Sequence, residues 1–179
     1  METGGLEKHQ NRHKLIIVDD EAVIREGMRR ILSAEGYHVE TSASGRTAIE
    51  KIQEQDFDVV ITDLKMPGMD GIEVLKTIKI LQPEVPVILI TAYSTVSSAV
   101  EAMKNGAFDY IAKPFSPDLI IDKVKKAIDY KTLMIDSFSD KQELSSDNGF
   151  NEFVGESIKM RKIYHRILQV APTNHFAKG

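Results

Sequence analysis

The chain has 179 residues, of which 42% are hydrophobic and 28% are charged, a balance typical of soluble globular proteins. It contains no cysteine, which excludes disulfides, thiol catalysis and zinc–thiolate sites. Its longest apolar stretch is too short to span a bilayer, and its first residues lack a secretory signal. The net charge of −4 gives no general attraction to nucleic acid. We therefore predict a cytoplasmic protein without membrane or direct nucleic-acid partners.

Short apolar runs alternate with helical patterns along most of the chain. The predicted strands are residues 15–18, 37–42, 57–62, 86–91 and 108–112. The predicted helices follow them, at residues 24–32, 45–55, 70–81 and 96–103, with a last one from residue 116. Gly36 and Gly106 stand where two of these helices should end, and Ser116 and Pro117 suit the start of the last one.

Five strand–helix units predict an α/β fold with a doubly wound parallel sheet. The run at 37–42 alternates apolar and polar residues, so we place it at the edge of the sheet. The first, third and fourth strands are the most apolar and belong in the middle. The predicted strand order is 2-1-3-4-5, as in flavodoxin-like folds, with a switch point between the first and third strands.

Polar residues follow four of the predicted strands. Asp19 and Asp20 follow the first strand, Asp63 follows the third, Thr91 ends the fourth and Lys113 follows the fifth. Ligands of open parallel sheets bind outside the carboxyl ends of the strands, so these side chains should converge in one crevice. Three neighbouring carboxylates repel one another unless a cation lies between them, and an all-oxygen ligand set favours Mg²⁺. The ammonium and the hydroxyl suit a phosphoryl group that Asp63 attacks.

Simpler interpretations exist for each residue taken alone. Asp20 can be an N-cap, Thr91 a plain cap, Lys113 a solvated charge and Tyr110 an ordinary core or surface tyrosine. The chain has five histidines without metal-ligand spacing, and we interpret all of them as structural or solvent-facing: His9, His13, His38, His165 and His175.

These residues stand in motifs that resemble the receiver domain of two-component response regulators. The order and spacing agree with that family in Val18-Asp19-Asp20-Glu21, Asp63-Leu64-Lys65-Met66-Pro67-Gly68-Met69-Asp70-Gly71, Thr91-Ala92 and Lys113-Pro114-Phe115. The resemblance covers residues 14–130. It implies that Asp63 is the phosphoacceptor and takes a phosphoryl group from a phosphohistidine of a sensor histidine kinase.

The resemblance also implies roles for the neighbours of Asp63. Asp20, Asp63 and the backbone carbonyl of Lys65 are expected to bind Mg²⁺ directly, with Asp19 assisting through water. This would make the chain a switch that accepts a phosphoryl group and slowly loses it, rather than an enzyme acting on a separate substrate.

On the phosphoryl side, the resemblance implies that Lys113 and Thr91 bind the phosphoryl oxygens. It also implies a cis peptide bond at Lys113–Pro114. Tyr110 occupies the position of the family's switch aromatic, which turns inward when Thr91 moves toward the phosphoryl group.

Outside the receiver, we predict a flexible tail at 1–13, a helix extension and linker at 131–152 and a basic helical segment at 153–179. The last segment resembles the start of the AAA+ ATPase domain of sigma-54-dependent transcriptional activators. A basic helix that packs on the receiver or a partner is the alternative. No phosphate-binding loop of the G-x-x-x-x-G-K-[ST] type occurs, so we predict no ATPase activity for this chain.

The predicted function is a transcriptional switch whose output passes through a homodimer. Ile121, Val124, Ile128 and Ile135 recur at near-heptad spacing in the last predicted helix, so we expect this helix and the linker to pair with a second copy. One alternative is a stand-alone receiver that acts by binding another protein. The other is an aspartyl-phosphate phosphatase of the haloacid dehalogenase type, but such enzymes need Asp-x-Asp after the first strand, where this chain has adjacent aspartates.

Overall fold

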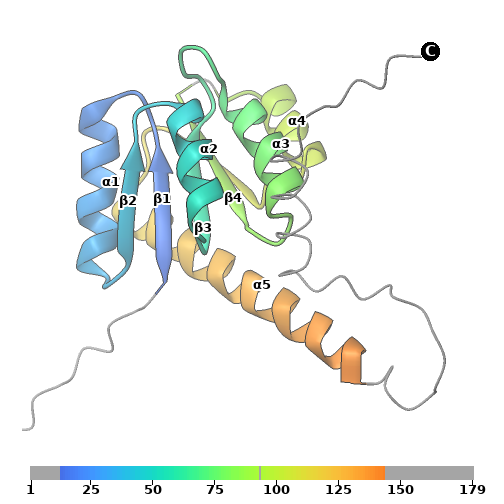
Figure 1. The fold of residues 1–179 in the computed structure, drawn as a ribbon. Coiled ribbons are helices and arrows are strands. Elements are labelled where there is room, and N and C mark those ends of the chain that lie inside the picture. Colours follow the sequence, from blue (N-terminus) through green and yellow to red (C-terminus); the bar gives the residue numbers. More distant parts are fainter. Residues whose placement is uncertain (1–12, 93, 144–179) are drawn as a thin grey trace, which may run out of the picture. The chain divides into compact units, whose positions relative to one another are not determined.

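The computed structural model describes residues 13–92 and 94–143, in which strands and helices alternate (Figure 1). The bounds are β1 (Lys14–Val18), α1 (Ala22–Ala34), β2 (His38–Ser42), α2 (Gly45–Glu54), β3 (Val59–Asp63), α3 (Gly71–Leu81), β4 (Val87–Thr91), α4 (Val96–Lys104), β5 (Asp109–Ala112) and α5 (Pro117–Glu143). The predicted tail up to residue 12, the linker beyond residue 143 and the predicted segment at 153–179 lie outside the described residues.

The five strands form one parallel sheet in the order β2-β1-β3-β4-β5, which confirms the predicted fold class and topology. β1, β3 and β4 are almost wholly buried, whereas β2 at the edge keeps partly exposed residues. In the register, Val18 pairs with Thr62 and Asp63 pairs with Ile90. The carboxyl ends of the strands therefore lie along one edge of the sheet, hereafter the carboxyl edge.

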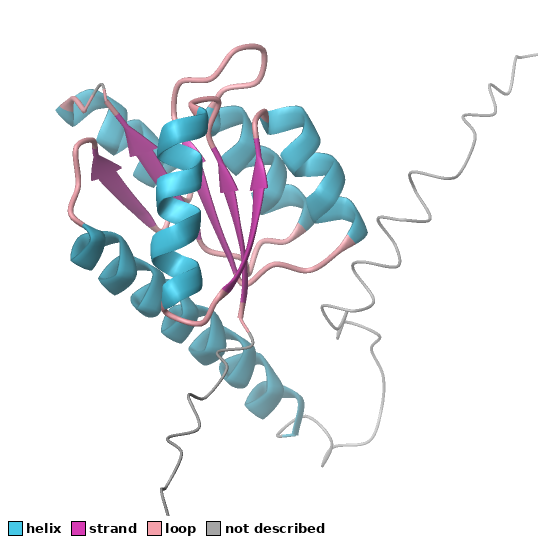
Figure 2. Ribbon diagram, turned by 90° about the vertical axis from the view of Figure 1, so that its left-hand side faces the viewer, coloured by secondary structure: helices cyan, strands magenta, loops and turns pink. Residues whose placement is uncertain are grey.

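Helices cover both faces of the sheet, as Figure 2 shows. Alternate side chains of β1 enter two different hydrophobic clusters, because successive residues of a strand point to opposite faces. Ile16 and Val18 pack in the cluster that contains α2 and α3, while Leu15 and Ile17 pack in the cluster that contains α1 and α5. Burial on both faces explains the continuous apolar runs of the central strands.

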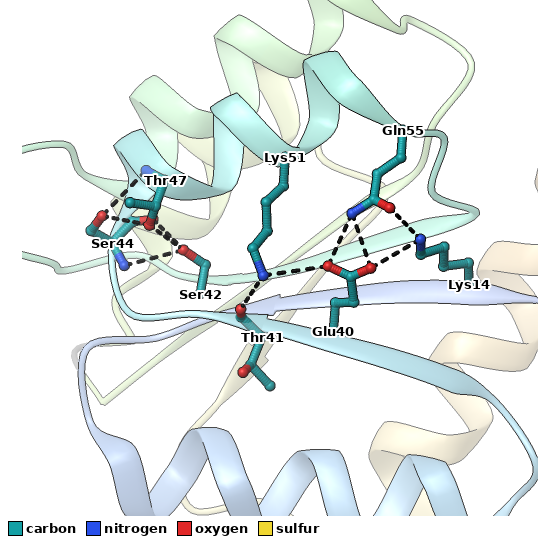
Figure 3. Close-up of polar contacts among 8 residues, drawn as sticks. All are labelled: Lys14, Glu40, Thr41, Ser42, Ser44, Thr47, Lys51 and Gln55. Carbon is teal, nitrogen blue, oxygen red and sulfur yellow. Dashed lines mark hydrogen bonds and ion pairs between the residues drawn. The ribbon is translucent and has the colours of Figure 1, made fainter.

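A polar network around Glu40 fastens the edge strand β2 to β1 and α2 (Figure 3). The Glu40 carboxylate accepts hydrogen bonds from Gln55 Nε2 at 2.9 and 3.0 Å and pairs with Lys14 Nζ at 2.9 Å and Lys51 Nζ at 3.3 Å. Burial alone would raise the pKa of Glu40, but these contacts outweigh burial and hold that pKa below its usual value. The network stabilises the edge strand, and its charges discourage pairing with a strand of another chain.

Helix α4 buries a different face from the one that its apolar periodicity marks. Val96, Val100 and Met103 are 84%, 46% and 52% exposed, and Ala102 is the residue that enters the core. The helix begins with a capping box in which the Thr95 hydroxyl accepts from the backbone N–H of its third residue, Ser98, an N-cap that sequence reasoning did not identify. The exposed apolar side of α4 is therefore a surface feature of the described fold.

Helix α5 starts at Pro117 and continues without a break to Glu143, which confirms that it runs past residue 130. Its core residues are Ile120, Val124, Ala127 and Ile128, so the core already covers the first part of the stripe predicted for pairing. Beyond that point the helix still exposes apolar side chains, notably Leu133 at 69%. Among the helices that the structure describes, none is long and apolar enough to cross a membrane.

Candidate functional site

Three carboxylates meet at the carboxyl edge of the sheet. Asp63 is the last residue of β3, and Asp19 and Asp20 directly follow β1, the strand beside it. One oxygen from each side chain lies within 4.8 Å of the others. Asp19 is fully buried and Asp63 is 7% exposed, while Asp20 faces solvent. The strand positions of these residues thus account for the predicted convergence.

Lys113 brings a positive charge to these carboxylates from the end of β5. Its Nζ donates to Asp19 Oδ2 at 2.9 Å and Asp63 Oδ2 at 3.0 Å, and it lies 3.3 Å from Glu21 Oε1. The Lys113 side chain is only 9% exposed. Burial alone would lower the pKa of Lys113, but the hydrogen bonds to Asp19 and Asp63 outweigh burial and raise the pKa above its usual value. The Lys113 ammonium therefore stays charged.

The hydrogen bond from Lys113 does not fully offset the cost of burying the Asp19 carboxylate. Burial raises the pKa of Asp19 above its usual value, and this effect exceeds the opposing effects of the Lys113 ammonium and the Glu21 backbone N–H. A single ammonium is shared by several carboxylates, so the group carries excess negative charge. An all-oxygen donor set with excess negative charge fits a divalent cation such as Mg²⁺.

The backbone around Asp63 is packed too tightly for a side chain at Gly71. A Cβ atom there would lie 2.2 Å from the carbonyl oxygen of Asp63 and 2.8 Å from the Cα of Leu64. The Gly71 N–H donates to the Leu64 carbonyl at 2.9 Å, which ties the start of α3 to the end of β3. Asp70 caps α3 with a full capping box. Helix α3 thereby fixes the segment that carries Asp63.

Thr91 and Lys113 are neighbours through the backbone. Thr91 is the fully buried last residue of β4, and its carbonyl accepts the Lys113 N–H at 2.8 Å. The peptide bond between Lys113 and Pro114 is cis. The sheet thus positions Thr91 and Lys113 at the same edge as the carboxylates.

Lys65 and Tyr110, which were also predicted for the site, each make a hydrogen bond in the structure. The Lys65 N–H donates to Asp63 Oδ1 at 3.4 Å. Tyr110, on β5, is partly buried, and its hydroxyl is hydrogen-bonded to Ser98 Oγ at 2.9 Å. Because Ser98 belongs to the capping box of α4, the Tyr110 ring is connected to the first turn of that helix.

Sequence reasoning did not assign roles to two residues that contact the site. Glu21 lies beside Lys113, and Arg25 Nη1 donates to the Asp19 carbonyl at 2.6 Å. Glu21 is the N-cap of α1 and Arg25 lies in its first turn. The receiver motif included Glu21 without giving it a role, and Arg25 offered no signal besides its charge.

The fold and the convergence of these carboxylates with Lys113 define a known class of protein. The chain matches the response regulator receiver domain family over residues 15–125 and belongs to that family.

Similar proteins include solved receiver domains and curated transcription regulators. A receiver domain protein from Clostridium thermocellum is 34% identical with a TM-score of 0.65, over 68% of this chain and 98% of that one. The beryllofluoride-activated NtrC4 receiver domain dimer is 37% identical with a TM-score of 0.64, over 66% of this chain and 98% of that one. The transcriptional regulatory protein ZraR of Escherichia coli K12 is 39% identical over 159 residues. That match covers 89% of this chain but 35% of ZraR, so the chain spans about a third of this relative's length.

Proposed function

We propose that this chain is a cytoplasmic switch of a two-component system in which Asp63 accepts a phosphoryl group from a phosphohistidine of a sensor histidine kinase. The observation that carries the proposal is the shared Lys113 ammonium, which lies 3.0 Å from Asp63 Oδ2 at the carboxyl edge of the sheet. Membership of the receiver family supports the same reaction.

In the proposed reaction, one carboxylate oxygen of Asp63 attacks the phosphorus atom. A P–O bond forms as the P–N bond of the phosphohistidine breaks, and the imidazole leaves with the electron pair of that bond. Lys113 shifts its donor to an oxygen of the transferred group, and the Thr91 hydroxyl donates to another. The buried position of Lys113 keeps competing water away from this contact.

The carboxylates at the carboxyl edge suit Mg²⁺. Asp20, Asp63 and the Lys65 carbonyl would bind the ion directly, and Asp19 would act through water. The proposed side-chain ligands are the three carboxylates whose oxygens lie within 4.8 Å of one another. A bound Mg²⁺ supplies positive charge that offsets the charge of the phosphoryl oxygens. Asp20 is the exposed member of the group and therefore the one that is least costly to reorient on binding.

We infer that Thr91 and Tyr110 transmit the phosphorylation state. As Thr91 moves toward the phosphoryl group, the Tyr110 ring turns into the space that is left, and its hydrogen bond to Ser98 breaks. That bond ends on the capping box of α4, so its loss weakens the start of the helix. The exposed apolar side of α4 would then change its position or its mobility.

The proposed output is control of transcription through a homodimer formed by α5 and the linker. The name of ZraR and the dimeric state of the NtrC4 receiver support this proposal.

The proposed division is a receiver at 14–130, a helix extension and linker at 131–152 and the start of a sigma-54-type AAA+ domain at 153–179. Exposed Leu133, past the last core residue of α5, supports pairing beyond the receiver.

Intact-mass spectrometry with acetyl phosphate and Mg²⁺ tests the phosphoacceptor. We expect a single phosphoryl adduct that Asp63→Asn abolishes and that the matched control Asp56→Asn, a change at an exposed aspartate, retains. An adduct that persists in Asp63→Asn would show that another residue is modified. Release of many phosphates per chain from small phosphate esters would instead indicate a phosphatase.

A further inference from the structure

Glu21 occupies the N-cap position of α1 but does not cap the helix. N-cap side chains normally accept a hydrogen bond from the second or third backbone N–H, and Ser, Thr, Asp and Asn have the right length for this. The Glu21 side chain makes no such bond. Its carboxylate instead extends to the end of β5, where Oε1 lies 3.3 Å from Lys113 Nζ. Its own N–H donates to Asp19 Oδ1 at 2.8 Å, which fixes the backbone from which the side chain extends.

The contacts of Lys113 use the full donor capacity of its ammonium. An ammonium has three N–H donors, and three carboxylates contact this one: Asp19, Asp63 and Glu21. The first two are buried and lie at 2.9 and 3.0 Å, whereas Glu21 is more distant and its side chain is 61% exposed. Because the Glu21 end of this pair is solvated, the contact with Glu21 is the least costly of the three to break.

We propose that Glu21 is the exchangeable anion on Lys113 and thereby sets how strongly the site holds a phosphoryl group on Asp63. The inference rests on the proposed function of Asp63. A phosphoryl oxygen needs a donor from Lys113, and it takes the one that Glu21 occupies. The Glu21 carboxylate competes for this donor and repels the incoming charge, so it lowers phosphoryl occupancy. In the unmodified state it keeps the ammonium saturated and limits binding of unrelated anions.

A titration with beryllofluoride, an anionic phosphoryl mimic, measures this competition. Bound fluoride is followed by ¹⁹F NMR on the full chain at saturating Mg²⁺. Glu21→Gln should tighten apparent beryllofluoride binding by about two- to fivefold, the range expected for an ion pair whose anion is solvated. The gain should shrink as ionic strength rises. Glu54→Gln makes the same charge change at an exposed residue on the last turn of α2, away from the carboxyl edge, and should bind like the wild type.

Mg²⁺ affinity without fluoride separates this role from a general effect on the site. Removing a carboxylate beside the metal ligands should leave Mg²⁺ binding unchanged or slightly weaker, while anion binding becomes tighter. Glu21→Asp keeps the charge but shortens the side chain, so it should recover only part of the gain. Thermal unfolding of each variant checks that the fold is intact.

Unchanged or weaker beryllofluoride binding in folded Glu21→Gln would overturn the inference. So would an equal gain in Glu54→Gln, because the effect would then follow net charge alone. Failure of the proposed function gives a different pattern, in which the wild type does not bind beryllofluoride or Asp63→Asn binds it equally well.

Discussion

The Lys131 ammonium on α5 lies 2.8 Å from Asp58 Oδ1, in the loop before β3, and also donates to the Phe57 carbonyl at 2.9 Å. Asp58 Oδ2 accepts the backbone N–H of Lys14 at 2.8 Å. The beginning of β1, the beginning of β3 and the extension of α5 are therefore joined at the edge of the sheet opposite the acidic site. This contact explains why α5 stays attached to the receiver past its last core residue.

Asp58→Asn should destabilise the protein at neutral pH. The Lys131 side chain is 13% exposed and that of Asp58 is 29% exposed, so the pair is screened only in part. We expect a loss of about 1–2 kcal/mol in the free energy of unfolding, the lower part of the range for a hydrogen bond to a charged group, because solvent screens the partly exposed pair. Urea denaturation at neutral pH measures it, and Asp122→Asn, which breaks an exposed ion pair within α5, is the matched control with little expected effect.

The Lys131–Asp58 pair also predicts how the loss of stability in Asp58→Asn depends on pH. Burial alone would raise the pKa of Asp58, but the hydrogen bonds from Lys131 and from the Lys14 N–H outweigh burial and hold the pKa below its usual value. A lowered pKa in the folded state stabilises the protein above the unfolded pKa, and this stability is lost as pH falls through the folded pKa. The difference between wild type and Asp58→Asn should therefore persist at pH 5 to 7 and shrink below about pH 4. A difference that grows toward acid pH would contradict this assignment.

Gly71→Ala should destabilise the fold and displace Asp63, because the new Cβ would collide with backbone atoms that cannot move independently. Overpacking of this kind typically costs about 1–3 kcal/mol. Gly27→Ala is the matched control, since a Cβ there meets nothing within 4 Å. In the middle of α1 it should stabilise the helix by about 1 kcal/mol. Thermal unfolding compares the two, and a Gly71→Ala protein that is as stable as the wild type, or stabilised like Gly27→Ala, would rule out the packing argument.

Asp20→Ala should weaken Mg²⁺ binding by at least about tenfold, because it removes a direct ligand from an all-oxygen site. Asp19→Ala should have a smaller effect, since its proposed contact passes through water. Isothermal titration calorimetry measures both, with Glu54→Gln as the distant control. A larger loss for Asp19→Ala than for Asp20→Ala would reverse the proposed ligand assignment.

Leu133→Glu in the full chain should weaken the proposed homodimer by about tenfold or more, because a charge would be placed in an apolar contact. Val23→Glu introduces the same charge at an 85% exposed position on α1 and should leave the dimer intact. Light scattering with and without beryllofluoride measures the oligomeric state, and truncation after Tyr130 should give a monomer. A full chain that is monomeric in both states would leave a stand-alone receiver that signals by binding another protein.

The sequence predicted the fold well because its apolar runs are those of a sheet buried on both faces. The errors lie at the ends of the strands. Tyr37 and Phe57 are buried at 5% and 1% exposure but precede β2 and β3, because burial begins before the ladder of hydrogen bonds. The exposed side of α4 could not be recognised either, since helical periodicity marks an apolar face without showing what covers it.

The site was predictable to the extent that strand ends determine it. Asp19, Asp63 and Lys113 could be placed together because the carboxyl ends of parallel strands share one edge. The contacts of Glu21 and Ser98 were not predictable, because each depends on how far one side chain extends toward a neighbouring element. Such contacts leave no spacing pattern in the sequence.

The imbalance between one ammonium and several carboxylates has a thermodynamic consequence for the whole receiver. Mutual repulsion at this edge opposes folding, and any cation that binds the folded form preferentially shifts the unfolding equilibrium by mass action. The melting temperature of the receiver should thus follow the supply of free Mg²⁺. Neutralising Asp20 would weaken that dependence and stabilise the ion-free protein, at the expense of a receiver that binds Mg²⁺, and so accepts a phosphoryl group, less readily.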